Sequence, residues 1–168
     1  MSNPHVSRRQ CLPCCALVIF GAGGDLTRRL IVPALYNLAQ QNRLPERFAI
    51  IGLDHNEKTA EQWRSELHQF LEDTVKSGKG EFEDKSVDET IWNRLAKSMS
   101  YVAGDFLESD TYARLRDHLQ QRDREEDLEG HAVFYLAAAD RFFGPIVDAL
   151  GHAGLANEEN GWRRVVIE

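Results

Sequence analysis

The residues of this chain that are best suited to chemistry form a glycine-rich stretch behind a short apolar run. Residues 16–20 lead into Gly-Ala-Gly-Gly-Asp-Leu-Thr, and a helical pattern begins within a few residues. Glycine permits the positive φ of a tight turn, and it has no Cβ to keep the backbone away from a pyrophosphate. The helix start that follows favours negative charge. This order predicts a dinucleotide-binding loop, with a plain strand-to-helix turn as the alternative. The candidate cofactor-binding residues are Gly21, Ala22, Gly23, Gly24, Asp25, Leu26, Thr27 and Arg28.

The spacing departs from G-x-G-x-x-G because Leu26 stands at the third glycine position. A G-x-x-G-x-x-T pattern fits better, with Gly21 and Gly24 in the turn and Thr27 where helix and strand pack closely. Asp25 is expected to cap the helix start, since a carboxylate facing a pyrophosphate would be repelled.

Two further features follow in the same stretch. The pair Arg28 and Arg29 is expected either to meet a cofactor phosphate or to be solvated. Pro33 is tolerated best near the first turn of a helix, which indicates an irregular helix start between Asp25 and Val32.

A second group of candidate residues follows the apolar run 48–53. Asp54 stands where an acid hydrogen-bonds the ribose of NAD, whereas His55 and Lys58 are suited to the 2′-phosphate of NADP. An ordinary turn built from Asp and Asn at the end of a strand is the alternative.

Short apolar runs alternate with helical patterns along the whole chain. The runs expected to be strands are residues 16–20, 48–53, 100–102, 132–136 and 164–167, and the expected helices are 30–41, 60–76, 89–98, 111–122 and 142–153. Residues 77–86 and the acidic stretch 123–130 are expected to be solvated loops. Parallel strands need crossover connections, so this alternation predicts an α/β fold, a Rossmann-like doubly wound parallel sheet with helices on both faces.

Composition limits the partners. The formal net charge of −7 argues against broad binding to nucleic acid or to anionic membranes, and no apolar run is long enough to span a bilayer. The chain is therefore expected to be cytoplasmic. The cysteines at 11, 14 and 15 are expected to be reduced thiols, and no metal site is expected.

The segment Gly-Ala-Gly-Gly-Asp-Leu-Thr-Arg-Arg at 21–29, followed by Pro-Ala-Leu-Tyr at 33–36, resembles the opening of glucose-6-phosphate dehydrogenases. Ser-Tyr-Val-Ala-Gly at 100–104, Phe-Tyr-Leu-Ala at 134–137 and Trp-Arg-Arg-Val-Val-Ile-Glu at 162–168 resemble later segments of that family in the same order. The resemblance implies oxidation of glucose 6-phosphate to 6-phosphogluconolactone with hydride transfer to NADP, in the oxidative pentose phosphate pathway. It also implies a homo-oligomeric full-length enzyme.

Departures from the family qualify this reading. Where the family has G-x-A-R after the second strand, this chain has Gly-Leu-Asp-His, so NAD stays open beside NADP. Where the family has P-P, this chain has Ala139 and Asp140, and Phe143 then stands on the nicotinamide side or packs as an ordinary first-turn residue.

The family's base histidine and sugar-phosphate motif do not occur in the chain. Hydride transfer needs both a held sugar and a base. We therefore expect residues 1–168 to be one dinucleotide-binding domain that ends before the catalytic part, with residues 1–13 flexible and no catalytic residue. The histidines at 68, 118 and 152 fall in helical patterns and are expected at surface positions. The alternative is a dinucleotide-binding regulatory module without catalysis.

Overall fold

Five parallel strands form the sheet of the computed structural model, which describes residues 12–78 and 86–168. The strands are β1 (Cys15–Phe20), β2 (Phe48–Asp54), β3 (Met99–Ala103), β4 (Ala132–Leu136) and β5 (Arg163–Ile167). Their order is β3-β2-β1-β4-β5, so the chain builds the sheet outward from β1 in one direction and then in the other. Residues 1–11 and 79–85, which include Cys11, most of the expected flexible start and part of the expected loop 77–86, lie outside the described residues.

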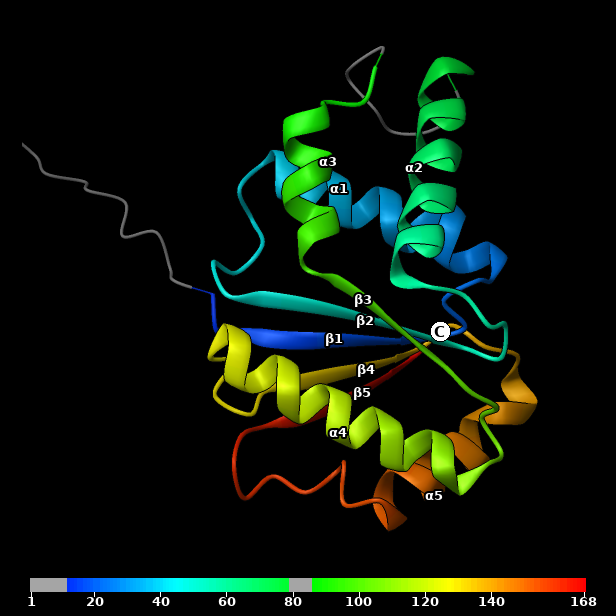
Figure 1. The fold of residues 1–168 in the computed structure, drawn as a ribbon, viewed down its shortest axis with the longest axis vertical. Helices are drawn as coiled ribbons and strands as arrows, with labels where there is room; N and C mark the ends of the chain where they lie inside the picture. Colours follow the sequence, from blue (N-terminus) through cyan, green and yellow to red (C-terminus); the bar gives the residue numbers. More distant parts are fainter. Residues whose placement is uncertain (1–11, 79–85) are drawn as a thin grey trace, which may run out of the picture.

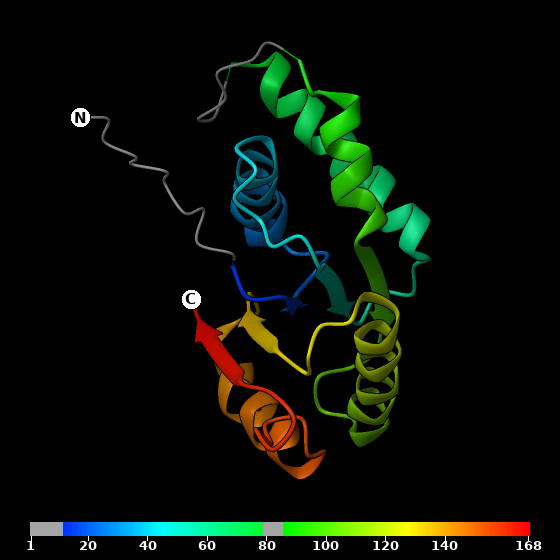
Figure 2. The ribbon, with the colours of Figure 1, turned by 90° about the vertical axis from the view of Figure 1, so that its left-hand side faces the viewer.

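Helices cover both faces of this sheet. One face carries α1 (Val32–Gln40), α2 (Ala60–Lys76) and α3 (Glu89–Lys97), and the other carries α4 (Ser109–Glu126) and α5 (Phe143–His152) (Figure 1). Figure 2, turned by 90°, shows the same two layers on either side of the strands. The expected α/β doubly wound architecture is confirmed. None of the described helices is long and apolar enough to cross a membrane.

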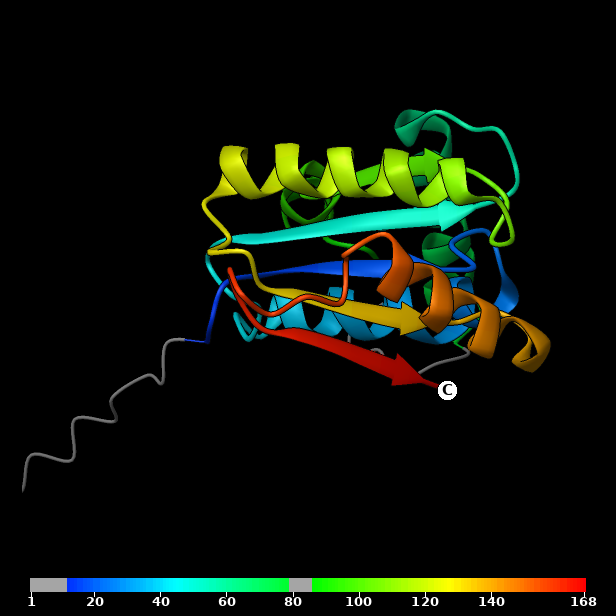
Figure 3. The ribbon, with the colours of Figure 1, turned by 90° about the horizontal axis from the view of Figure 1, so that it is seen from below.

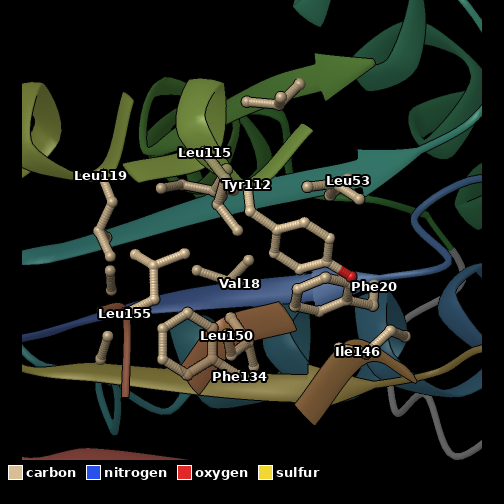
Figure 4. Close-up of a cluster of buried hydrophobic side chains, with 14 of the residues drawn as sticks. Val18, Phe20, Leu53, Tyr112, Leu115, Leu119, Phe134, Ile146, Leu150 and Leu155 are labelled. Atoms are coloured by element: carbon tan, nitrogen blue, oxygen red, sulfur yellow. The ribbon is translucent and has the colours of Figure 1, made fainter. Parts of the chain in front are cut away.

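The central strand, β1, shows why both faces of the sheet must be covered by helices. Alternate residues of a strand point to opposite faces. Val18 and Phe20 pack toward α4 and α5, while Ile19 between them packs toward α1 and α2, and all three are fully buried. In the core beneath α4, the ring of Phe20 stacks on Tyr112 at a centroid distance of 6.3 Å, and Leu115 lies beside them (Figure 4).

The start of α1 is irregular, as Pro33 predicted. A π-helical turn, Thr27–Ile31, runs directly into α1, and Pro33 lies in the first turn of that helix. Proline has no N–H and its ring crowds the carbonyl four residues earlier, so regular helical hydrogen bonding cannot continue through it. The wider turn accommodates this break.

The expected loop over 123–130 is partly wrong, because α4 continues to Glu126. Arg122 forms ion pairs with Glu125 and Glu126 at the spacings that favour a helix, and Asp127 then ends it in the left-handed conformation. Only the last residues of the acidic stretch form a turn.

Strand β5 lies at one edge of the sheet, beside β4 (Figure 3). Val165, Val166 and Ile167 are 38 to 55 % exposed, although they are apolar. The described part of the chain therefore presents uncovered apolar surface along this strand.

Two leucines test the assignment of the core. We predict that Leu115→Ala, at a fully buried position of α4, lowers the free energy of unfolding by about 2–5 kcal/mol because it leaves a cavity. Leu107→Ala, at a position that is 65 % exposed, should change it by less than about 0.5 kcal/mol. Urea denaturation measures both, and equal losses would contradict the described packing.

Candidate dinucleotide-binding site

The glycine loop lies at the carboxyl end of β1, where the strand order reverses between β1 and β4. Gly21 has φ of +89°, and a Cβ at that position would lie 2.4 Å from the carbonyl oxygen of Ala137 at the end of β4. Its amide donates to the carbonyl of Leu53 at 2.9 Å. Ligands of open α/β sheets bind in the crevice at such a switch point. The first glycine of the motif therefore stands where the backbone after β4 leaves no room for a side chain.

Three side chains from three different elements hold this loop. Thr27, expected where helix and strand pack closely, is fully buried, and its Oγ1 donates to the Gly21 carbonyl at 2.8 Å. The Gly23 amide donates to Asp54 Oδ2 at 2.9 Å, and Trp63 Nε1 donates to the Ala22 carbonyl at 2.9 Å. These contacts fix the backbone of the loop without any ligand.

The helix start behind the loop offers donors to an anion. The first helical hydrogen bond runs from the Arg28 amide to the Gly24 carbonyl at 3.3 Å. The amides of Asp25, Leu26 and Thr27 precede it, so the helix itself cannot satisfy them. Such amides, at the positive end of a helix dipole, suit a phosphate group. The residues present therefore fit a dinucleotide pyrophosphate.

The charged residues of the loop turn away from these amides. The expected capping role of Asp25 is wrong: its carboxylate accepts a hydrogen bond from Arg29 Nη1 at 3.3 Å, one helical turn away. The Asp25 carboxylate pairs with Arg29 because the two side chains, four residues apart, share an exposed helical face. The guanidinium of Arg28 lies 5.7 Å from the ring centre of Phe70 on α2.

Asp54, at the end of β2, is 4 % exposed and makes several contacts inside the protein. Besides the Gly23 amide, its carboxylate accepts hydrogen bonds from the Asn56 amide at 3.3 Å and from Asn56 Nδ2 at 3.0 Å. Nδ1 of His55 lies 2.9 Å from Asp54 Oδ1, while the His55 side chain is 71 % exposed. Sequence reasoning placed Asp54 correctly at the strand end, but it did not find that the carboxylate points into the glycine loop.

The pKa of a neighbouring tyrosine, Tyr101, is raised beside this carboxylate. Burial, together with the negative charge of Asp54, raises the pKa of Tyr101 to about 12. The hydroxyl of Tyr101 donates to the Asn56 carbonyl at 2.7 Å, so the phenol is held as a neutral donor beside the site.

A cavity of about 620 Å³ adjoins His55 at the carboxyl ends of β2 and β3. It is lined by two cationic side chains, Lys58 and Arg114, and Lys58 is already paired with Glu66. The acidic side chains that line it are Glu57, Asp105 and Glu108. Arg114 was missed by sequence reasoning because it comes from α4, 60 residues away from Asp54 in the chain.

The model of the family "Glucose-6-phosphate dehydrogenase, NAD binding domain" matches residues 18–168. The chain belongs to the glucose-6-phosphate dehydrogenase family. It is 34 % identical over 160 residues to the glucose-6-phosphate 1-dehydrogenase of Chlamydia muridarum. The matched region covers 93 % of this chain and 30 % of that relative. It is 31 % identical over 155 residues to glucose-6-phosphate 1-dehydrogenase 2 of Mycobacterium tuberculosis, where the shares are 92 % and 29 %.

Solved structures agree with the sequence comparison. A glucose-6-phosphate 1-dehydrogenase from Mycobacterium avium superposes with a TM-score of 0.73 at 28 % identity, covering 92 % of this chain and 29 % of that one. A glucose-6-phosphate dehydrogenase in complex with its substrate glucose-6-phosphate superposes with a TM-score of 0.77 at 25 % identity, covering 91 % and 30 %. The chain thus spans about 30 % of the length of the relatives it matches.

Other candidate residues of this family member have structural contacts. Phe143 begins α5 and packs, half-buried, against the core under β1. His118, expected at the surface, is half-buried instead: its Nε2 lies 2.8 Å from Ser100 Oγ, and burial lowers its pKa. His68, also expected at the surface, is half-buried and is paired with Glu89 at 2.9 Å. Cys14 and Cys15 are free thiols, as expected.

Two glycines test the geometry of the loop. We predict that Gly21→Ala lowers the free energy of unfolding by about 2 kcal/mol or more, because it combines a positive φ with a backbone clash. Gly144→Ala on α5 meets nothing within 4 Å and should be neutral or stabilising by up to about 1 kcal/mol. Chemical denaturation of both variants gives the comparison. A Gly21→Ala protein as stable as the parent would show that the loop is not held as described.

Proposed function

We propose that this chain is the coenzyme-binding part of a glucose-6-phosphate 1-dehydrogenase. The observation that carries the proposal is the family match over 18–168 combined with a preformed glycine loop at the sheet's switch point. The relatives are about three times as long as this chain, and one related structure is described in complex with glucose-6-phosphate. The whole enzyme would oxidise glucose 6-phosphate to 6-phosphogluconolactone.

Each part of the site has a definite task in this proposal. The amides of Leu26 and Thr27 bind the pyrophosphate, while Asp54 and Trp63 keep the loop in the shape that exposes them. When bound, the nicotinamide ring supplies the hydride acceptor. The sugar-phosphate site and the base that removes the hydroxyl proton come from protein outside residues 1–168.

The resemblance implies NADP, whereas the residues at the end of β2 favour NAD. A 2′-phosphate would add two negative charges beside the buried carboxylate of Asp54 and the acidic lining of the adjoining cavity. Lys58 is already neutralised by Glu66. We therefore propose that NAD binds more tightly than NADP. Arg114 and His55 would give the 2′-phosphate of NADP weaker contacts.

The net charge and the family bear on the partners, the location and the assembly of the enzyme. The net charge of −7 supports small-molecule partners rather than nucleic acid or anionic membranes, in a cytoplasmic enzyme. The exposed apolar residues of β5 suit a contact with further protein, consistent with a larger homo-oligomeric enzyme.

A chimera tests the proposed activity. Residues 18–168 would replace the matching segment of the Chlamydia muridarum enzyme, and the formation of reduced coenzyme from glucose 6-phosphate would be followed by absorbance. We expect measurable turnover by the chimera and none by the 168-residue chain alone. The chimera carrying Gly21→Ala is the matched control and should lose activity by at least about tenfold. A folded chimera that binds dinucleotide without turnover would favour the regulatory module instead.

A charge change tests the coenzyme preference. Calorimetric titration of the chain should give a lower Kd for NAD than for NADP. His55→Arg restores a cation at the strand end and should shift the ratio toward NADP by about tenfold, the effect of one charge-assisted contact. His152→Arg makes the same change on the exposed side of α5 and should leave the ratio unaltered. Tighter binding of NADP by the unmodified chain would overturn this preference.

A further inference from the structure

The indole of Trp63 reaches from α2 into the glycine loop. Its side chain is almost completely buried, and its N–H donates to the carbonyl of Ala22, a residue with no exposed surface. A buried carbonyl depends on a protein donor, because water cannot reach it. The loop residue that lies between the two glycines is therefore attached to a helix 41 positions away in the chain.

The fold makes room for this indole at Gly52 of β2. A Cβ on Gly52 would lie 2.7 Å from the six-membered ring of Trp63 and 2.9 Å from the Cβ of Ala22. The ring of Tyr101 also packs against the indole, at a centroid distance of 5.6 Å. Because the indole fills the space between strand and loop, neither can shift toward the other.

We infer that Trp63 is a positioning residue of the dinucleotide site. This inference rests on the function proposed above. By holding the Ala22 carbonyl, the indole fixes the peptide that leads into Gly23, whose amide is in turn held by Asp54. These two contacts, from α2 and from β2, hold the carbonyl and the N–H of the same Ala22–Gly23 peptide and so fix the orientation of its plane. The helix-start amides that receive the pyrophosphate are thereby presented before the ligand arrives, which reduces the ordering cost of binding.

The test compares two tryptophan variants of the whole chain. Trp63→Phe removes the indole N–H and part of the ring. Trp92→Phe makes the same change in the same core cluster, where the ring packs at a tilt against His68. The first measurement is amide hydrogen exchange without ligand. In Trp63→Phe the amides of Ala22, Gly23 and Gly24 should exchange about tenfold faster, whereas Trp92→Phe should leave them as in the parent chain.

The second measurement is the Kd for NAD by calorimetry. Trp63→Phe should weaken binding about fivefold to tenfold, with little change for Trp92→Phe. Gly52→Ala, which displaces the indole but keeps its N–H, should weaken binding by a similar factor. Equal effects of the two tryptophan variants, or unchanged loop exchange in Trp63→Phe, would overturn the inference. If the parent chain binds neither NAD nor NADP, the proposed function fails, while the exchange measurement still decides whether Trp63 holds the loop.

Discussion

The hydrogen bond between the buried carboxylate of Asp54 and the amide of Gly23 fixes the relation between β2 and the glycine loop. A carboxylate removed from water is costly unless it is paired, and Asp54 meets this condition with the loop amide, Asn56 and His55. Moving the loop would leave the buried charge without one of its donors. The end of the strand and the start of the binding site therefore behave as one unit.

The topology makes this contact available. Strand β1 lies at the centre of the sheet with β2 on one side and β4 on the other, so the loop that follows it touches the ends of both neighbours. Gly21 donates to Leu53 at the end of β2, and Ala137 at the end of β4 donates to Phe20, both at 2.9 Å. The close approach of Ala137 excludes a side chain at position 21. The switch point is thus also the place where glycine is required.

The layers of the fold could be predicted because they depend on local periodicity. Apolar runs indicated each strand, helical spacing indicated each helix, and Thr27 could be placed from the spacing of the glycine motif. Boundaries were less accurate where a local pattern was ambiguous. The acidic residues after Arg122 suggested a loop because of their polarity, but ion pairs one turn apart extend α4 through them.

The contacts that shape the site were harder to predict, since they join residues distant in the chain. Asp54 was expected to face a ribose, and only its position in space shows that the carboxylate also holds Gly23, 31 positions away. The indole of Trp63 fits the apolar face of α2, and that pattern gives no sign of its polar contact with the loop. Asp25 was misjudged because Arg29, on the same helical face, competes for its carboxylate.

The most direct test of this account is an NMR titration of the chain with NAD, following the backbone amides. We expect the largest chemical-shift changes at Leu26 and Thr27, with the Gly23 amide keeping its contact to Asp54 throughout. Changes confined to the opposite edge of the sheet, or release of the Gly23 amide on binding, would contradict a preformed loop that receives the pyrophosphate.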